Sequence, residues 1–575
     1  MRPNTRGVVT LWARILKTPF AICVSRLKLR AQKMSQMLKS SGAMGLAVII
    51  SRILGFIREA IYAWFMGDGA VASAFQLAFQ IPNLFRRLLG EGALSAAFIP
   101  IFKEKEKNAG EAEMWRSASA VISGLMVAAA VIIGLVMLGL TGVLMMQSPG
   151  KEHFLQFNSQ TLLMLHLLRL MFPYMLMVCL AAIFIGMLNA RGYFFVPAFG
   201  TAILNIVMIG SVVFLAPLMG ASLQQQIFGV AIGVLLAGVA QAAFQWNSLR
   251  KEGFHYQWVS PRNNQTVREV LRKMIPGMMG VAAFQINVLV TNGMAFYVDD
   301  KIVASFNYAV RLMELPQGVF GVSIATYLLP ALSGLALDKK YPEFRSTLRQ
   351  AMGYLIFVNL VTTVLLVVMA EPIVRLLFER GKFTPDSTER AAWALQFLAP
   401  GLIIFSLVNI LARAFYALGD TRTPMRISVL CLGVNLVLAS LFILPYHNAP
   451  HTPHMLPPQA GLGLANTLSA VFNLSLLLYA LRKKMKRLEL AELGKNLIPL
   501  LASAVASGLT AIAVHRAWEK AVGHAHLLQK LGEVFVPMTL AAVVYGTMTY
   551  LLKIPSALEV FHLVRQKLTG ERKAD

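Results

Sequence analysis

The chain has 575 residues, of which 57% are hydrophobic and only 14% are charged, and its mean hydropathy is +0.63. Soluble domains carry roughly 25% charged residues, so this composition argues against soluble domains and indicates an integral membrane protein. The formal charge of +26 comes from 53 Lys and Arg against 27 Asp and Glu. The three cysteines are far apart in sequence and support neither a disulfide framework nor a zinc site, and we expect no metal or other cofactor.

Fourteen apolar segments long enough to cross a bilayer follow one another along the chain. We place them at 41–66, 71–100, 117–147, 160–188, 195–217, 226–248, 270–297, 302–333, 352–370, 388–418, 424–446, 460–482, 496–515 and 531–552. The predicted fold class is therefore an all-α polytopic membrane protein with fourteen transmembrane helices.

The basic residues are distributed unevenly between the two sides of these spans. If both termini are cytoplasmic, 37 Lys and Arg fall at the cytoplasmic side and 8 in outer loops. This positive-inside bias predicts cytoplasmic termini and explains the net charge without nucleic acid as a partner. Residues 1–40 carry nine cations and no carboxylate. They form either a basic interfacial arm or, if translation starts at Met34 or Met37, no part of the mature protein.

Sequence landmarks recur about 230 residues apart. The pairs are Phe75 and Phe306, Pro100 and Pro330, Pro173 and Pro400, and Pro197 and Pro424. We predict two six-helix lobes, 41–248 and 270–482, joined by a cytoplasmic linker at 249–269 and related by a twofold axis along the membrane normal. Residues 483–575 add two helices and a basic tail. Paired lobes of this kind favour a transporter that works by alternating access, and no segment is long enough for a soluble catalytic domain.

The eight cations that we count on neither side of the membrane are all arginines, which lie within or close to a span: Arg52, Arg58, Arg86, Arg87, Arg169, Arg311, Arg375 and Arg413. Charges at this depth usually face a cavity or a partner, although snorkelling suits those near helix ends. In the first span, Ser51 and Arg58 share a face, Arg52 lies about 120° around the helix, and Glu59 can neutralise one cation. We expect Arg52 and Arg58 to contact the substrate.

The second span carries one continuous polar stripe, because Gln76, Gln80, Asn83 and Arg87 recur at helical spacing. Arg86 lies at its margin, and a large polar stripe facing lipid would be unfavourable. Pro82, Gly90 and Gly92 weaken the helix near the end of this stripe, and we expect the helix to bend there. The acidic residue Glu91 lies between the two glycines.

The corresponding segment of the second lobe reads NYAVRLMELPQGVFG. Asn307 and Arg311 are four residues apart, and Glu314 lies three residues beyond Arg311, so the last two can form a salt bridge within the helix. That pair is either structural or a clamp that an anion releases. Pro316 and Gly318 follow as candidate hinge residues.

Arginine in a cavity points to a particular chemistry. Its guanidinium stays protonated and presents a planar fork that matches phosphate oxygens with two parallel hydrogen bonds. We therefore assign the diphosphate or other anionic group of a substrate to Arg52, Arg58, Arg86 and Arg311. The other polar residues named above would line the cavity or gate it.

The runs SRILGFIREAIYAWFMGDGAVASAFQLAFQIPNLFRRLLGEGALSAAFIP, NYAVRLMELPQGVFGVSIATYLLP, RLLFERGKFTPDST and RAFYALGDTRTPMRIS strongly resemble the MurJ (MviN) lipid II flippase family of the MOP superfamily. The resemblance covers about residues 38–555. It implies a cationic central cavity and transport of undecaprenyl-diphosphate-linked disaccharide-pentapeptide from the inner to the outer leaflet of the bacterial cytoplasmic membrane. It also implies that Arg52, Arg58, Arg86 and Arg311 matter, with Glu314 as their acidic companion, and that the last two helices form a groove for the lipid tail.

Further expectations concern partners and energy. The partners would be lipid II, membrane lipids and, as a further option, other cell-wall synthesis proteins. A negative cell interior favours outward movement of an anionic headgroup, so we expect the membrane potential to drive transport, with ion coupling left open.

The chain departs from the family pattern in both lobes. Ser73 and Val310 stand where the family commonly has aspartate, which makes the cavity more positive than is typical. Some members bind sodium in the second lobe, but here Arg413 follows Asn409 by one turn, and we predict no such site.

Two alternatives remain at this point. One is another exporter of the same superfamily, for a polysaccharide-linked lipid or a drug. The other is a membrane enzyme acting on polyprenyl-linked sugars, which would need catalytic carboxylates, whereas the adjacent pair Asp299 and Asp300 lies in a short outer turn.

Overall fold

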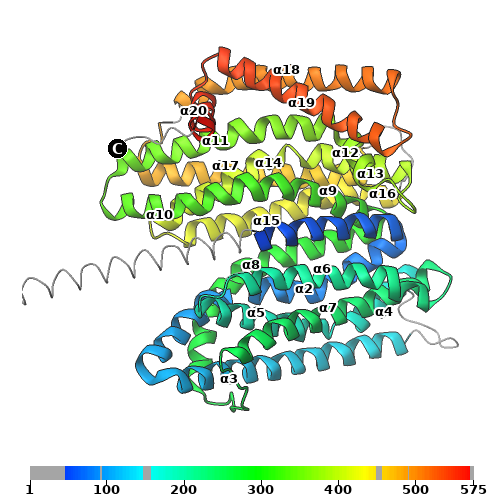
Figure 1. Cartoon of the computed structure of the whole chain (residues 1–575), viewed down its shortest axis with the longest axis vertical. Coiled ribbons are helices and arrows are strands. Elements are labelled where there is room, and N and C mark those ends of the chain that lie inside the picture. The colour runs from blue at the N-terminus through cyan, green and yellow to red at the C-terminus, as the bar shows by residue number, and fades with distance from the viewer. Residues whose placement is uncertain (1–45, 91–92, 147–156, 449–455, 490, 570–575) are drawn as a thin grey trace, which may run out of the picture.

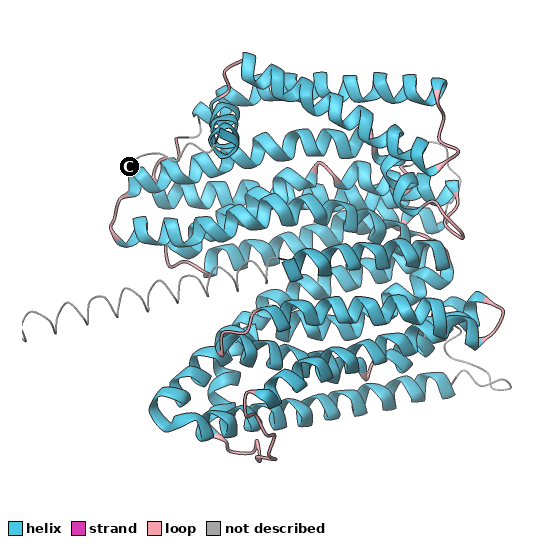
Figure 2. Cartoon of the chain, in the orientation of Figure 1, coloured by secondary structure: helices cyan, strands magenta, loops and turns pink. Residues whose placement is uncertain are grey.

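The computed structural model describes residues 46–90, 93–146, 157–448, 456–489 and 491–569. Within these ranges the chain consists of helices joined by turns and loops, and no strand is present (Figure 2). The predictions for residues 1–40, for Glu91 and for Gly92 lie outside the described residues.

The first lobe contains the N-terminal helices. Its first helix covers 46–66, and the others are α2 (Ala70–Gly90), α3 (Ala93–Met145), α4 (Ser159–Met171), α5 (Tyr174–Ala190), α6 (Phe195–Gly210) with the short turns η1 (Ser211–Leu215) and η2 (Ala216–Met219), and α7 (Leu223–Lys251). Polar residues start several of these helices. The side chain of Asn158, for example, accepts a hydrogen bond from the backbone nitrogen of Thr161 at 2.8 Å, and Ser222 and Gln225 form a capping box at the start of α7.

The second lobe follows the linker. Its elements are α8 (Gln265–Val298), α9 (Ile302–Pro316), the π-helical turn η3 (Gln317–Val322), α10 (Ser323–Leu337), α11 (Tyr341–Val368), α12 (Ala370–Phe378), α13 (Pro385–Leu398), α14 (Gly401–Ala417), α15 (Arg422–Ile443), α16 (Pro445–Asn448) and α17 (Pro458–Met485). The chain ends with α18 (Ala491–Ala521), α19 (Leu527–Leu551) and α20 (Pro555–Thr569), which lie at the outer edge of the second lobe (Figure 1).

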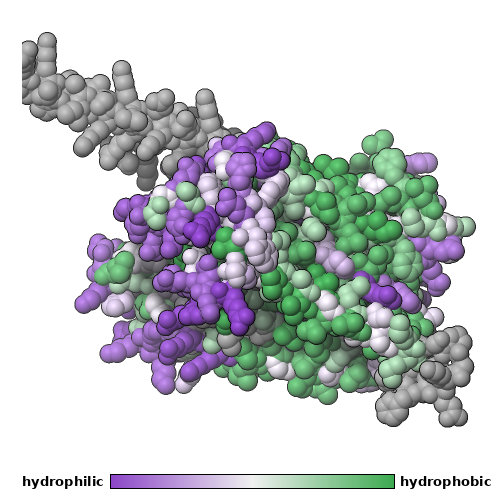
Figure 3. All heavy atoms as spheres, turned by 90° about the horizontal axis from the view of Figure 1, so that it is seen from below, coloured by the Kyte–Doolittle hydropathy of each residue, from purple (hydrophilic) through white to green (hydrophobic). Residues whose placement is uncertain are grey.

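These helices confirm the predicted membrane fold. In the described part of the chain, nine helices are long and apolar enough to cross a membrane, and two bent pairs bring the number to eleven. The three other predicted spans correspond to the first helix, α2 and α8, which all contribute polar side chains to the interior described below. A broad hydrophobic band separates two hydrophilic ends on the face shown in Figure 3. Large apolar side chains such as those of Leu138 and Phe214 are exposed.

The two bent pairs reveal the internal repeat. Helices α4 and α5 meet at 45°, and α13 and α14 meet at 44°. Pro173 and Pro400, the landmarks 227 residues apart, lie at the two bends as N-caps of α5 and α14. Proline lacks the amide hydrogen that would continue the preceding helix, so the same residue produces the same bend in each lobe.

The repeat is broken at one place. We predicted a second span over 71–100, but α2 ends at Gly90 and residues 93–100 belong to α3. Helix α3 then kinks at Gly110, which has a φ of 85° that other residues rarely adopt. The matching segment of the second lobe continues from α9 through η3 into α10, with Pro316 at the end of α9 and Gly318 inside η3.

The hydrophobic cores show how the lobes meet. One core contains residues of both lobes, including Tyr62, Phe75, Phe306 and Phe383. Two further cores lie elsewhere: one contains residues of α3, α5, α7 and α8, and the other contains residues of the second lobe and the terminal helices. The lobes therefore share a core at one end of the helices, near the turn that follows the first helix. Toward the other end the first lobe and the second lobe have different cores, although the start of α8 contributes to the core of the first lobe. We call these the closed end and the open end.

Candidate functional site

A cavity of about 740 Å³ lies between the two lobes. The first helix, α2 and α9 supply one part of its lining, and α8, α14, α15 and α17 supply most of the rest. Phe75 and Phe306, the first pair of repeat landmarks, border it from the shared core at the closed end. The cavity is thus positioned where both halves of the repeat contribute side chains.

Five charged residues line the first part of the cavity and are called the charged wall: Arg58, Glu59, Arg87, Arg311 and Glu314. Glu59 forms an ion pair with Arg58 beside it and lies 3.6 Å from Nε of Arg311 in the other lobe. Nη1 of Arg311 also donates to Glu314 at 2.8 Å. Positive and negative groups therefore alternate from the first helix to α9 and link the two lobes.

The position of Arg58 is fixed by neighbours on three sides. Its Nη1 donates to Oδ1 of Asn205 on α6 at 3.0 Å, and its guanidinium lies 5.8 Å from the centre of the Tyr62 ring. The side chain is only 14% exposed. A charge so deeply placed needs these partners, because an unpaired buried cation is strongly unfavourable.

The polar stripe of α2 faces the same cavity. Gln76, Gln80, Asn83 and Arg87 all line it, in agreement with their helical spacing. Oε1 of Gln80 accepts a hydrogen bond from Asn292 of α8 at 2.8 Å, and Nη1 of Arg87 donates to Gln285 of α8 at 3.4 Å. Helix α8 is thereby joined to the first lobe as well as to α15 in its own lobe.

Other residues from the sequence analysis lie outside the cavity lining. The guanidinium of Arg52 lies against Gly318 of η3, so closely that a Cβ there would be 2.5 Å from Nη1. Nε of Arg86 donates to Asn83 on the same helix at 2.7 Å. Ser51 is bonded to Thr201 at 2.6 Å. Of the four arginines assigned to the substrate, the structure brings Arg58 and Arg311 together at the cavity and places Arg52 and Arg86 beside it.

The rest of the lining has a different character. No charged residue is present among the described cavity residues of α8, α14, α15 and α17. These helices instead present carboxamides, of which five form what we call the amide wall: Asn287, Asn409, Asn435, Asn466 and Asn473. Asn409 was weighed from the sequence only as a sodium ligand, and the other four asparagines had no predicted role. Their signal was weak, since Asn466 and Asn473 are seven residues apart on an otherwise apolar helix.

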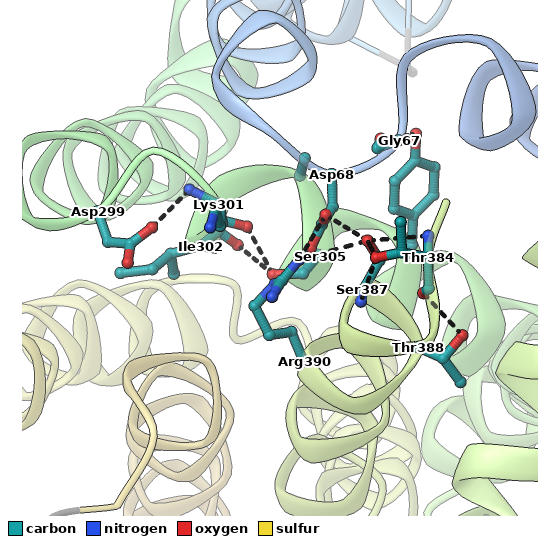
Figure 4. A network of polar contacts seen from close by, with 12 residues as sticks. Gly67, Asp68, Asp299, Lys301, Ile302, Ser305, Thr384, Ser387, Thr388 and Arg390 are labelled. Atoms are coloured by element: carbon teal, nitrogen blue, oxygen red, sulfur yellow. Dashed lines mark hydrogen bonds and ion pairs between the residues drawn. The ribbon is translucent and has the colours of Figure 1, made fainter. Parts of the chain in front are cut away.

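A polar network joins the lobes at the closed end. Asp68, in the turn after the first helix, is 3% exposed and accepts hydrogen bonds from Nε and Nη2 of Arg390 at 2.7 and 2.9 Å. Oγ of Ser387 donates to the same carboxylate at 2.6 Å, and the hydroxyl of Tyr308 donates to the carbonyl of Gly67 at 3.1 Å. Figure 4 shows this network between the first helix, α9 and α13. Asp68 had no role predicted from the sequence.

Backbone contacts complete the closed end. The backbone nitrogen of Lys382 donates to the carbonyl of Trp64 at 3.0 Å. Gly67 has a φ of 63°, and a Cβ there would lie 2.5 Å from the carbonyl oxygen of Lys382. Only glycine combines this conformation with such a close approach.

The residues that depart from the family pattern also have clear positions. Oγ of Ser73 is buried and accepts a hydrogen bond from the backbone nitrogen of Ala304 at 3.2 Å. Val310 lines the cavity beside Arg311. The outer aspartates Asp299 and Asp300 are not among the residues that line the cavity. Asp299 accepts a hydrogen bond from the backbone nitrogen of Lys301, and Asp300 accepts one from Gln160.

Comparison with known proteins decides the family. The model of the family described as lipid II flippase MurJ matches residues 62–531. This chain belongs to the MurJ family. A probable lipid II flippase MurJ of Vibrio cholerae serotype O1 is 33% identical over 457 residues, which cover 77% of this chain and 82% of the relative. Another, from Rhizobium tropici, is 31% identical over 532 residues, covering 92% and 96% of the two chains.

Solved structures support the same architecture. A lipid II flippase MurJ in an inward closed conformation is 22% identical, with a TM-score of 0.68, and the match covers 88% of this chain and 99% of that one. A multidrug resistance MATE family transporter of the MOP superfamily, in an inward-facing conformation, matches with a TM-score of 0.58 at 15% identity, covering 76% and 95%. The MurJ fold of this chain is thus shared with the wider MOP superfamily.

Proposed function

We propose that this chain is a lipid II flippase of the bacterial cytoplasmic membrane. It moves the undecaprenyl-diphosphate-linked disaccharide-pentapeptide from the inner to the outer leaflet by alternating access and acts as a transporter, not as an enzyme. The observation that carries the proposal is the link from Arg58 through Glu59 to Arg311, which joins the two lobes across the cavity.

The diphosphate would bind where this link now lies. Each guanidinium offers a fork of parallel N–H donors to phosphate oxygens, and the low-polarity surroundings strengthen such contacts. Arg58 and Arg311 stand on different lobes, so one diphosphate bound to both would favour states in which the lobes are close. A ligand shifts a conformational equilibrium only by its preference for one state, and this bridging contact supplies that preference.

Arg52 and Arg86 would act at the margin of this site. Arg52 packs on Gly318, at the π-helical turn that follows Pro316, and Arg86 is held by Asn83 of the polar stripe. A movement of η3 or of the end of α2 would release either guanidinium toward the headgroup. Their contact with the substrate remains a prediction.

The distribution of basic residues supports an orientation with both termini cytoplasmic, so the open end would face the cytoplasm. The negative interior then favours outward movement of an anionic headgroup by about 2.3 kcal/mol per charge for each 100 mV. It also favours inward return of the cationic cavity. We expect no cofactor, and the partners are lipid II and the surrounding lipids, with other cell-wall synthesis proteins as further candidates.

The test is depletion of this protein in its source cell, followed by measurement of which lipid-linked precursors accumulate on the cytoplasmic leaflet. Lipid II should accumulate there within a few generations, and expression of the intact chain should reverse the effect. Accumulation of a different polyprenyl-linked glycan, with lipid II distributed normally, would assign the protein to another exporter class.

A further inference from the structure

The amide wall is uncharged, whereas the charged wall carries arginines and glutamates, and a cavity that only bound anions would not require this difference. Described cavity residues on α8, α14, α15 and α17 include many carboxamides and hydroxyls but no Arg, Lys, Asp or Glu. A cavity that only attracted phosphate would gain by placing cations on all sides. The division into two chemically distinct walls indicates that a second, uncharged part of the ligand is recognised.

Three members of the amide wall form an ordered chain. Nδ2 of Asn287 donates to Oδ1 of Asn435 at 3.0 Å, Nδ2 of Asn435 donates to Oδ1 of Asn466 at 3.4 Å, and Nδ2 of Asn466 donates to the carbonyl of Leu462 at 3.0 Å. Because every bond runs in the same direction, the orientation of each amide is fixed. Each of the three amides still has hydrogen-bonding capacity beyond the bonds in this chain.

The other two members have no bond to fix them. Within the described part of the chain, Asn409 and Asn473 have no hydrogen-bond partner for their side chains, and Oδ1 of Asn473 is buried without a partner. An unpaired buried carboxamide oxygen is unfavourable by roughly 1–3 kcal/mol, so a group that donates to it would be bound favourably. These two residues lie on α14 and α17, which pack against each other.

Carboxamides have a defined binding preference. Each one offers donors and acceptors without charge, which matches hydroxyl groups and secondary amides. They cannot neutralise phosphate, and fixed polar groups in a cavity set the orientation and specificity of a ligand. A cavity that held only ordered water would not require amides whose hydrogen bonds all run in one direction across three helices.

We propose that the amide wall binds the carbohydrate part of the lipid-linked headgroup through its hydroxyl and amide groups, while the charged wall binds the diphosphate. This inference rests on the proposed function. It assigns substrate specificity to the second lobe and places the sugar against α14, α15 and α17, with Asn409 and Asn473 making direct hydrogen bonds to it.

The experiment measures the affinity of the full-length protein in nanodiscs for three lipids with the same tail: undecaprenyl diphosphate, the same lipid carrying the disaccharide without peptide, and lipid II. The intact protein should bind the disaccharide lipid more tightly than undecaprenyl diphosphate. The double variant Asn409→Leu/Asn473→Leu should lose about tenfold in affinity for the two sugar-bearing lipids, as expected for two neutral hydrogen bonds, and should bind undecaprenyl diphosphate as before. That retained binding also shows that the variant is folded.

Asn247→Leu is the matched control, because Asn247 is exposed on α7 and does not line the cavity; it should change no affinity. Equal binding of undecaprenyl diphosphate and the disaccharide lipid by the intact protein would overturn the carbohydrate assignment and leave the proposed function standing. Equal losses of affinity for all three lipids in the double variant would have the same consequence. A gain in affinity that appears only when the peptide is added would also overturn the carbohydrate assignment. Failure of the intact protein to bind any of the three lipids would instead reject the proposed function and this inference with it.

Discussion

The charged wall and the amide wall solve different recognition problems within one cavity. The charged wall contains a contact between the lobes, from Glu59 to Arg311, so this contact changes when the lobes move. The amide wall lies within one lobe, and its central bonds run between neighbouring helices of that lobe. The first is therefore suited to sense the substrate and drive movement, and the second to recognise the substrate without being altered by movement.

The largest expected effect is on the charged wall. Arg58→Lys or Arg311→Lys keeps the charge but removes the planar fork, and we expect flipping to fall by about a hundredfold as measured by the lipid II content of the outer leaflet. Arg116→Lys, at an exposed position on α3, should have no effect. Full activity of both lysine variants would show that the wall acts only through its overall field, which would remove the contrast between the two walls.

The second effect concerns the driving force. Collapse of the membrane potential in intact cells should slow flipping by roughly tenfold, because the transported headgroup is anionic. The amide-wall variant Asn409→Leu/Asn473→Leu should keep the same proportional dependence on potential, since it changes no charge. Flipping that continues at an unchanged rate after the collapse would contradict the role of the potential.

A third test examines the closed end, which lies apart from both walls of the cavity. Asp68→Asn removes the charged acceptor of two hydrogen bonds from Arg390, and charge-assisted bonds of this kind contribute about 1.5–3 kcal/mol each. We expect the fraction of molecules in which the two lobes are separated at the closed end to increase at least tenfold. The distance between spin labels at Ala221 and Asp386 would measure this fraction. Asp299→Asn is the matched control, because it also neutralises a carboxylate but the hydrogen bond that this carboxylate accepts lies within one lobe. An equal shift in that variant would reject a specific cross-lobe contact.

The smallest effect is expected at a residue outside the cavity lining. Asp420, in the loop between α14 and α15, has its pKa lowered to about 2, chiefly by a hydrogen bond from Lys484. A lowered carboxyl pKa stabilises the fold above the unfolded-state value, and this contribution is lost as the pH falls toward 2. Because both side chains are partly exposed to solvent, Asp420→Asn should reduce the unfolding free energy by only about 0.2–1 kcal/mol at neutral pH. Thermal unfolding in detergent would measure this, and altered substrate affinity would contradict its separation from both walls.

Sequence periodicity predicted the fold well, for physical reasons. Membrane spans depend on apolar length, so most of the fourteen spans could be placed from the sequence, although the second one ends at Gly90 and not at residue 100. Pro173 and Pro400 were recognised as repeat landmarks, but the bends at these two residues were not predicted. The stripe of Gln76, Gln80 and Asn83 could also be placed, because one helix face carries all three residues. Their binding roles remain predictions.

Contacts between distant helices could not be read in the same way. The packing of Arg52 on Gly318 and the pairing of Asp68 with Arg390 depend on how the lobes meet, which no local spacing records. The amide wall was missed for a related reason: its asparagines are spread over α8, α14, α15 and α17 and converge only in space. Isolated asparagines in apolar helices were the available signal, and each one alone was too weak to interpret.

Glu59 gives the resting protein a property that its net charge does not reveal. Lying between Arg58 and Arg311, its carboxylate acts as an internal counter-anion, so the two guanidinium groups are never left bare when the cavity is empty. Binding of the diphosphate to these two arginines, as we propose, would exchange one anion for another, and the net affinity would be the difference between the two interactions. A transporter built in this way can hold a doubly charged headgroup without binding it too tightly to let it go.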